Sequence, residues 1–324
     1  MNETVLVTGG LGYIGSHTVI ELLANGIKPV IVDNLSNSKI VVKDLIESVA
    51  GEKIEFVQLD FTNRQALEQF ASSYPKIESI IHFAAHKYVG ESVQEPLKYY
   101  QNNLGSLLNL LQVFGNRPLN FIFSSSCTVY GEPDVLPVTE TSEIKKAESP
   151  YGNTKQIAEE ILRDAAKINP LLRVAVLRYF NPVGSHSSGK IGELPLHVPQ
   201  NLFPFITQTA IGIRKQLTVF GGDYHTPDGT CIRDYIHVVD LAQSHISAMK
   251  YLAKHRTDEM NYDVFNIGTG TGYSVLEIIK AFESVNNVKV NYTIGPRRAG
   301  DIEKIFGSPD KANTLLHWKA KYTL

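Results

Sequence analysis

Residues 4–15 read Thr-Val-Leu-Val-Thr-Gly-Gly-Leu-Gly-Tyr-Ile-Gly, an apolar run followed at once by a glycine-rich turn. The turn contains GxGxxG at Gly10, Gly12 and Gly15, and GxxGxxG when Gly9 is counted in place of Gly10. Glycines at such positions let the chain turn sharply, bring backbone amides close to a pyrophosphate and allow a helix to pack closely on a strand. Alone the pattern is weak, because a glycine-rich turn with a capping acid also matches it.

Two acidic residues strengthen the interpretation of this turn. Asp33 closes the second apolar run, at roughly the distance from the glycines that a dinucleotide-binding turn requires. A carboxylate there accepts hydrogen bonds from both ribose hydroxyls and repels a 2′-phosphate, so we expect NAD rather than NADP as the cofactor. Asp60, after the third run, is placed to bind an adenine edge, although an acid that only ends a strand fits nearly as well.

The first half of the chain alternates short apolar runs with longer amphipathic stretches. The predicted strands are 4–8, 29–33, 54–60, 79–85, 120–126 and 173–179. Their apolar residues are nearly continuous, as in a parallel sheet that is covered on both faces. The clearest predicted helices are 14–25, 97–114 and 150–168, the last opened by Ser149 and Pro150 as N-cap and first helical residue. This alternation predicts the α/β class, with a doubly wound, Rossmann-like parallel sheet.

The composition of the sequence and the pattern of predicted elements change after about residue 181. Residues 181–232 are rich in Gly, Pro, His and Ser, and they contain one predicted helix near 201–214. The remaining predicted elements are a helix at 238–253, a strand at 263–267, a helix at 274–284 and a strand at 288–294. We therefore divide the chain into an NAD-binding domain, 1–180, and a smaller C-terminal α/β substrate lobe, 181–324, of which some elements return to the first sheet.

Length and composition exclude several classes of protein. The 324 residues suit about two domains, and 31 Lys+Arg against 33 Asp+Glu give a net charge of −2, without a general basic field for nucleic acid or an anionic membrane. No apolar run reaches the ~18–20 residues of a membrane span, and the N-terminus lacks the pattern of a signal peptide. The default expectation is a cytoplasmic protein.

Metal binding has little support in the sequence. Two cysteines, Cys127 and Cys231, are too few for a disulfide framework or a four-cysteine zinc site. His82 and His86 are four residues apart, but on a predicted strand and loop rather than on a helix. We therefore predict no metal site.

A candidate reactive site combines three residues. Tyr151 and Lys155 share a face of the predicted helix, and a nearby ammonium would lower the pKa of the phenol from about 10 towards the range of a general base. Ser126 ends the fifth strand, at the edge where open α/β sheets bind ligands. Each signal is weak alone, since a serine cluster at a strand end is more often a turn. Taken together, the three residues predict one site.

The predicted helix 97–114 is apolar on more than one side, so both sides must be buried. One side would cover the sheet. The other would pack against a second subunit, or against the second lobe of the same chain, and the sequence favours neither.

These segments carry a resemblance to a known family. TGGLGYIGSH, DNLSNS, HFAAHKYVGES, FSSSCTVYG, SPYGNTK, LRYFNPVG, GTCIRDYIHVVDLA and PRRAGD occur in this order between residue 4 and about residue 319. Together they resemble the extended short-chain dehydrogenase/reductases and, more narrowly, the UDP-glucose (UDP-galactose) 4-epimerase family. The glycine turn and YxxxK are shared across the superfamily, whereas DNLSNS, YFNPVG and RDYIHVVDLA are closer to the epimerases.

The resemblance implies roles for individual residues. Those implied to bind NAD are Gly9, Gly12, Tyr13, Ile14, Gly15, Asp33, Asn34, Asn37, Ser38, Asp60, Phe61, Phe83, Ala84, Ala85, Lys87, Asn102, Ser126, Tyr151, Lys155 and Tyr179. Ser126, Tyr151 and Lys155 would form the catalytic set. Those implied to bind the UDP-sugar are Lys87, Ser126, Tyr151, Asn181, Asn201, Leu202, Phe220, Arg233, Arg298 and Asp301. Arginine suits a diphosphate because its guanidinium donates in a fork, although a surface salt bridge is its commoner role.

The implied reaction is reversible C4 epimerisation of UDP-galactose and UDP-glucose through a 4-keto sugar, with NAD staying bound. A 4,6-dehydratase is the nearest alternative, but it needs an acid/base pair after Ser126, where this chain has Cys127 and Thr128. An inactive NAD-binding regulator is a further alternative. The position that gates N-acetylated substrates in relatives is Ile305, intermediate in size, which leaves UDP-N-acetylhexosamines open.

The resemblance also implies a homodimer through helices 97–114 and 150–168. Relatives continue past the last residues, WKAKYTL, with another amphipathic helix. That helix lies outside the implied catalytic set, so we expect the chemistry not to depend on it.

Overall fold

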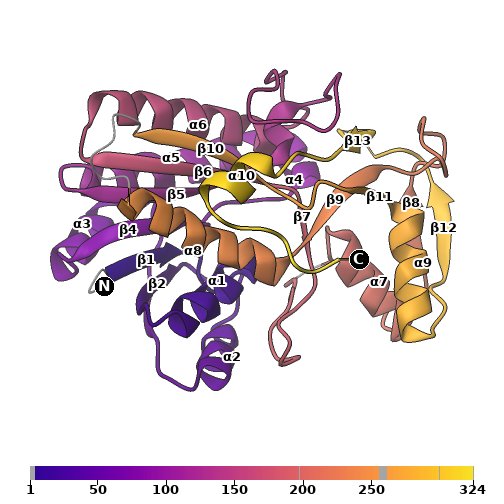
Figure 1. The fold of residues 1–324 in the computed structure, drawn as a ribbon. Coiled ribbons are helices and arrows are strands. Elements are labelled where there is room, and N and C mark those ends of the chain that lie inside the picture. Colours follow the sequence, from indigo (N-terminus) through magenta and orange to yellow (C-terminus); the bar gives the residue numbers. More distant parts are fainter. Residues whose placement is uncertain (1–3, 197, 255–260, 299, 324) are drawn as a thin grey trace.

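The computed structural model describes residues 4–196, 198–254, 261–298 and 300–323, and its centre is a seven-stranded parallel sheet (Figure 1). The strand order is β10-β6-β5-β4-β1-β2-β3. The strands are β1 (Thr4–Thr8), β2 (Pro29–Asp33), β3 (Glu55–Gln58), β4 (Ile77–His82), β5 (Leu119–Ser126), β6 (Leu172–Tyr179) and β10 (Tyr262–Ile267). From β1 the chain builds outwards to β2 and β3, then returns and builds the other way from β4. The order thus reverses between β1 and β4, where such sheets bind ligands.

Helices cover both faces of this sheet (Figure 1). One face is covered by α1 (Tyr13–Ala24), α2 (Val41–Ala50) and α8 (Val238–Lys254), and the other by α3 (Arg64–Ser73), α5 (Pro96–Phe114) and α6 (Pro150–Ile168). Successive residues of β1 show why both faces are covered. Val5 and Val7 pack in the apolar core on one face of the sheet, and Leu6 packs in the core on the other face. Apolar residues at every position of a strand require a cover on both sides. The predicted doubly wound α/β class is confirmed.

Smaller sheets and helices form a second region. Its elements are β7 (Asn181–Val183), α7 (Leu202–Ala210), β8 (Leu217–Phe220), β9 (Ile232–His237), β11 (Gly272–Ser274), α9 (Val275–Asn286), β12 (Tyr292–Gly295) and β13 (Lys304–Ile305). β9 is the central strand, because β7, β11 and β13 all pair with it, while β8 pairs with β12. Their core contains Ile206, Leu217 and Ile278. Between these elements the chain returns to the large sheet, where β10 pairs with β6 and α8 covers one face.

Three short helices complete the description: α4 (Val89–Gln94), the 3-10 helix η1 (Cys127–Tyr130) and α10 (Asp310–Leu315). Within the described ranges, no helix combines the length and the apolar character that crossing a bilayer demands.

Most predicted boundaries hold within a few residues, and the exceptions have local causes. The helix predicted near 201–214 ends at Ala210, and Gly212 follows with a φ of 77°, outside the helical region. The strand predicted at 288–294 begins only at Tyr292, because α9 continues to Asn286 and ends on Asn287 in a left-handed conformation. β4 stops at His82 instead of residue 85, which leaves residues 83–85 free to line a cavity.

Candidate active site

A cavity of about 380 Å³ lies along the carboxyl ends of the central strands and is bordered by both regions of the chain. Its lining includes every residue implied above to bind NAD and the whole candidate set Ser126, Tyr151 and Lys155. Of the residues implied to bind the UDP-sugar, only Leu202 and Phe220 lie outside the lining. Leu202 begins α7, and Phe220 ends β8 with its side chain 43% exposed. The fold therefore gathers segments that lie far apart in the sequence.

The glycine turn has the shape that a bound pyrophosphate needs. A Cβ at Gly9 would stand 2.9 Å from the backbone nitrogen of Ala84, and one at Gly15 would stand 2.4 Å from the Gly9 carbonyl oxygen. The N-cap of α1 is Gly12, with extended backbone and no side-chain cap. The first amides of α1 are therefore available to an anionic ligand, and the positive end of the helix favours one.

Asp33 is held in one orientation beside this turn. Its Oδ2 accepts a hydrogen bond from Leu11 N at 3.1 Å, and its Oδ1 accepts from Leu35 N at 2.9 Å and from Ser38 Oγ at 2.8 Å. These donors fix a carboxylate at the end of β2, in the lining of the cavity. The arrangement suits the ribose hydroxyls of a dinucleotide, and the role of Asp33 in binding them stays a prediction.

Asp60 lies further along the same wall. Its Oδ1 accepts from Thr62 N at 2.8 Å, and its Oδ2 accepts from Asn34 Nδ2 at 3.0 Å. Partial burial raises the pKa of Asp60, but the hydrogen bonds from Thr62 and Asn34 outweigh it and hold the pKa below its ordinary value. Asp60 is therefore an ionised acceptor that lines the cavity.

Ser126 and Tyr151 meet where β5 and α6 come together. Ser126 is the last residue of β5, and its Oγ accepts from Thr128 N at 3.3 Å. Tyr151 lies in the first turn of α6, which Ser149 caps by accepting from Gly152 N at 3.1 Å. Burial raises the pKa of Tyr151 to about 12. A hydrogen bond with Ser126 acts in the opposite direction, but its effect is smaller.

Lys155 lies one turn further along α6. Its Nζ donates to the Ser124 carbonyl oxygen at 2.6 Å and lies 5.9 Å from the centre of the Tyr151 ring. Burial lowers the pKa of Lys155 to about 8, and the charge of Glu159 opposes this effect. The expected lowering of the Tyr151 pKa by Lys155 is outweighed in the polypeptide by itself, because burial raises that pKa to about 12.

Two arginines face each other across a shared carboxylate at the far end of the cavity. Asp301 Oδ1 lies 2.7 Å from Arg298 Nη2 and 3.5 Å from Arg233 Nη2. Arg233 comes from β9 and Arg298 from the segment after β12, and all three residues line the cavity. Two guanidinium groups at this spacing can grip a diphosphate.

Sequence reasoning missed Glu193. It lines the cavity, its Oε1 accepts from Asn201 Nδ2 at 2.6 Å, and it pairs with Lys87 Nζ at 3.3 Å. It lies in a segment without periodicity, so no signal in the sequence marked it. Glu193 places a negative charge beside two of the residues implied to bind the substrate.

The residues that the structure describes do not form a metal site. Among them, no three His, Cys, Asp or Glu side chains gather as a metal site, and Cys127 and Cys231 are both buried free thiols. His82 is occupied by a hydrogen bond of 2.8 Å between its Nδ1 and Thr8 Oγ1.

Comparison with known proteins identifies the family. A family model described as GDP-mannose 4,6 dehydratase matches residues 6–324. A curated UDP-glucose 4-epimerase from Dictyostelium discoideum is 49% identical, over 99% of this chain and 92% of its own length. A crystal structure of UDP-glucose 4-epimerase from Bifidobacterium longum, in complex with NAD+ and UDP, superposes with a TM-score of 0.94 at 45% identity, over 99% of this chain and 94% of its own.

A UDP-Glc/GlcNAc 4-epimerase from Campylobacter jejuni is also similar, with a TM-score of 0.83 and 37% identity over 99% of this chain and 95% of its own. The family model and the relatives differ in the reaction that they name, dehydration or epimerisation. The relatives carry more weight, because they match nearly the whole chain at high identity and because Cys127 and Thr128 follow Ser126 where a dehydratase needs an acid/base pair. The chain belongs to the UDP-glucose 4-epimerase family.

Proposed function

We propose that this protein interconverts UDP-galactose and UDP-glucose, with NAD as a cofactor that stays bound. The observation that carries the proposal is the single cavity, which joins the uncapped start of α1, the set Ser126, Tyr151 and Lys155, and the Arg233–Arg298 pair. A dinucleotide at one end and a sugar nucleotide at the other would meet at Tyr151. Residues 1–180 would supply most of the NAD site and residues 181–324 most of the UDP-sugar site.

The proposed cofactor fits the chain on its own geometry. The first amides of α1 suit the pyrophosphate, the oriented carboxylate of Asp33 suits a ribose, and Asp60 suits the adenine end. The chemistry that bound NAD would supply is the uptake of a hydride from C4 of the sugar and its return to the other face of the same carbon.

Tyr151 would take the proton from the sugar O4 as a phenolate while Ser126 hydrogen-bonds the same oxygen. Because burial raises the pKa of Tyr151 to about 12, the phenolate needs more positive charge than the described polypeptide places beside it. An oxidised nicotinamide is positively charged, so a bound cofactor would lower that pKa further than Lys155 does alone. When the ketone is reduced, the proton would return from Tyr151 to O4 and the hydride to C4, so no external redox partner would be consumed.

Inversion requires that the 4-keto sugar present both of its faces to the same reacting groups. Arg233 and Arg298 would hold the diphosphate, with Asn201 near the nucleoside. Leu202 and Phe220, at the start of α7 and the end of β8, would contact the UDP-sugar from outside the cavity lining. The hexose itself would then have few fixed contacts, Asn181 and Lys87 among them, and could turn about the diphosphate.

A homodimer is the proposed assembly. α5 and α6 lie side by side (Figure 1), joined by hydrogen bonds from Asn153 Nδ2 to Tyr100 OH at 2.6 Å and from Asn103 Nδ2 to Thr154 Oγ1 at 3.1 Å. On α5 the side chains of Leu97 and Leu108 remain 79% and 41% exposed. The same pair of helices from a second copy would cover this surface. A cytoplasmic location stays a prediction.

The test is to incubate the purified protein with UDP-galactose, with no NAD added, and to follow the sugar by proton NMR. Inversion at C4 supports the proposal. A 4-keto-6-deoxy product would replace it with the dehydratase that the family model describes. A protein that binds NAD and UDP but does not turn over, even with added NAD, would be an inactive regulator.

A further inference from the structure

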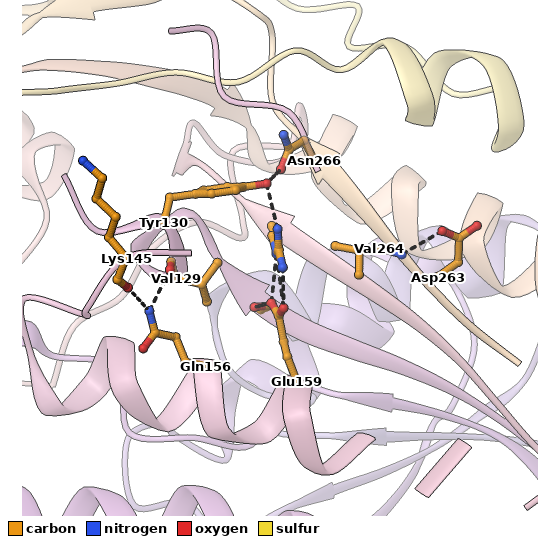
Figure 2. A network of polar contacts seen from close by, with 10 residues as sticks. Val129, Tyr130, Lys145, Gln156, Glu159, Asp263, Val264 and Asn266 are labelled. Carbon is orange, nitrogen blue, oxygen red and sulfur yellow. Dashed lines mark hydrogen bonds and ion pairs between the residues drawn. The ribbon is translucent and has the colours of Figure 1, made fainter. Parts of the chain in front are cut away.

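A buried ion pair lies behind the candidate catalytic set without lining the cavity. Glu159 on α6 and Arg178 on β6 are only 3% and 2% exposed. Arg178 donates from Nε to Glu159 Oε1 at 3.1 Å and from Nη2 to Oε2 at 2.6 Å. Figure 2 shows Glu159 reaching from the helix towards the sheet. Removing two charges from water costs much free energy, so a buried ion pair is weak evidence for a purely stabilising role.

On the side away from the cavity, the pair is tied to the rest of the fold. Arg178 Nη1 donates to Tyr130 OH at 3.0 Å, and Tyr130 OH donates to Asn266 Oδ1 at 2.6 Å (Figure 2). Asn266 Nδ2 then donates to the Val138 carbonyl oxygen at 3.1 Å. This outer arm joins β6, η1 and β10, and it carries no group of the catalytic set.

On the side of the cavity, the Glu159–Arg178 pair is connected to the candidate catalytic set in two ways. Ser125 Oγ donates to Glu159 Oε1 at 2.5 Å, and Ser125 directly precedes Ser126 on β5. Glu159 also lies one turn beyond Lys155, as Lys155 lies one turn beyond Tyr151, so the three residues form one stripe along α6.

The charges around Lys155 come from several elements. His82 on β4 is neutral, because burial, assisted by the charge of Lys155, lowers its pKa to about 3. Tyr262 on β10 is neutral too, since burial, together with the charge of Glu159, raises its pKa to about 12. The cations near Glu159 are Arg178 on β6 and, one turn further along α6, Arg163, which lies over the Tyr262 ring.

Tyr151 completes these surroundings, as a phenol that burial keeps protonated. Glu159, one turn along α6 from Lys155, is thus the acid whose charge opposes the burial that lowers the pKa of Lys155 to about 8.

We propose that Glu159 is a positioning residue of the epimerase reaction: it keeps Lys155 charged and, through Ser125, holds the end of β5 that carries Ser126. The inference rests on the proposed function, because it takes Ser126, Tyr151 and Lys155 as the reacting set. Arg178 pairs with this side chain through two hydrogen bonds and so supplies a positive charge beside it in the interior.

The test is a double variant, Glu159→Gln with Arg178→Met. A single change would leave one charge buried without its partner, whereas the double change removes both charges, keeps an acceptor for Ser125 and leaves Tyr130 hydrogen-bonded to Asn266. Without the carboxylate, Lys155 loses its proton at lower pH. The alkaline limb of the kcat profile should therefore move to lower pH by about one unit, with kcat approaching the parent value on the acid side of that limb.

Two matched variants separate this role from mere packing. Tyr130→Phe removes the hydrogen bonds of the Tyr130 hydroxyl with Arg178 and Asn266 without changing a charge near Lys155. It should therefore lower the melting temperature and leave the alkaline limb of the kcat profile in place. Glu159→Asp keeps the charge, so its limb should stay within a few tenths of a unit, and this test does not depend on the folding of the double variant. A limb shifted as far by Tyr130→Phe or Glu159→Asp as expected for the double variant would overturn the proposal.

The proposal also falls if the double variant folds, loses kcat and keeps the parent alkaline limb, because Glu159 would then only support packing. Tyr151→Phe, measured beside it, distinguishes this result from a failure of the proposed function. If Tyr151→Phe is inactive, only the role of Glu159 is lost. If it stays near the parent activity, the catalytic set itself is wrong and the inference falls with it.

Discussion

Lys87 and Glu193 form an ion pair between the two regions of the chain, with Nζ 3.3 Å from Oε1. Lys87 follows β4 of the large sheet, and Glu193 belongs to the segment between β7 and α7. Both line a cavity for which we propose two diphosphate ligands. The carboxylate would therefore compete with those proposed ligands for the ammonium of Lys87.

Glu193→Gln should strengthen the binding of UDP. The amide still accepts from Asn201, but it no longer repels a diphosphate or engages Lys87 as an ion pair. We expect the dissociation constant of UDP to fall about fivefold at low salt, and less at high salt, because a screened charge interaction is worth ~1 kcal/mol. Isothermal titration calorimetry measures it, with Glu68→Gln on the exposed side of α3 as the control. Weaker binding would mean that the Glu193 charge holds the site together.

Tyr151→Phe should remove most of the activity and leave binding intact. The change deletes the proposed base, whose contribution to a rate is typically ~10²–10⁴-fold. NMR turnover of UDP-galactose gives kcat, and calorimetry with UDP checks that the site still forms. Tyr74→Phe, which loses a hydroxyl that is bonded to Glu55 far from the cavity, is the matched control. Activity near the parent level in Tyr151→Phe would remove Tyr151 from the role of base.

The best-predicted helices and strands were those whose ends are marked by residues close to them in the sequence. α6 begins and ends where the capping pair Ser149 and Pro150 and the apolar spacing predict, since those signals lie within the helix and its cap. The end of β4 was harder to predict, because it depends on Thr8. The backbone oxygen of Thr8 accepts from Phe83 N, and its Oγ1 accepts from Ala84 N, contacts that span about the first quarter of the chain.

The positions of the site residues could be predicted, but their electrostatics could not. Ser126, Tyr151 and Lys155 follow from the ends of a strand and the face of a helix. The raised pKa of Tyr151 depends on how deeply the folded chain buries the phenol, which the spacing of residues in the sequence does not reveal. Glu193 escaped notice for a similar reason, because its partner Lys87 lies 106 residues away in a different region.

Acid should destabilise the protein partly through His82. Burial lowers the pKa of His82 to about 3, so between pH 3 and the ordinary value of about 6.5 the unfolded chain binds one more proton at this site than the folded protein does. Folding stability therefore falls as the pH falls through this window. The slope should be shallower by ~1.4 kcal/mol per pH unit in His82→Gln than in the parent between about pH 4 and 6.

Chemical denaturation across this range measures the slope. Glutamine retains a polar group for the hydroxyl of Thr8, so the comparison tests the titration rather than the lost hydrogen bond. His225→Gln, which removes an imidazole from an exposed site, serves as the control. Parallel curves for His82→Gln and the parent would show that His82 does not stay neutral in the folded state.

Ile305 should control the acceptance of N-acetylated sugars. It is 1% exposed on β13, lines the cavity and packs in the same core as Phe180 and Ile302. Ile305→Ala removes three carbons from the wall, so the ratio of kcat/KM for UDP-N-acetylglucosamine over UDP-glucose should rise. Ile305→Tyr should lower it. A large-to-small change in a core costs ~2–5 kcal/mol of folding stability. Any resulting loss of folded enzyme lowers both kcat/KM values equally, so their ratio does not change for that reason. Equal ratios in both variants would remove Ile305 from substrate selection.

Leu108 should decide whether two copies associate. The parent protein should elute in light-scattering chromatography with twice the 36.0 kDa mass of the chain. Leu108→Lys places a charge in the proposed apolar contact, where burying it unpaired is costly, so this variant should dissociate at micromolar concentration. Val285→Lys on α9, at a side chain 84% exposed and away from α5, should remain a dimer. A parent protein that elutes as a monomer would contradict the assembly, and so would dissociation of both variants alike.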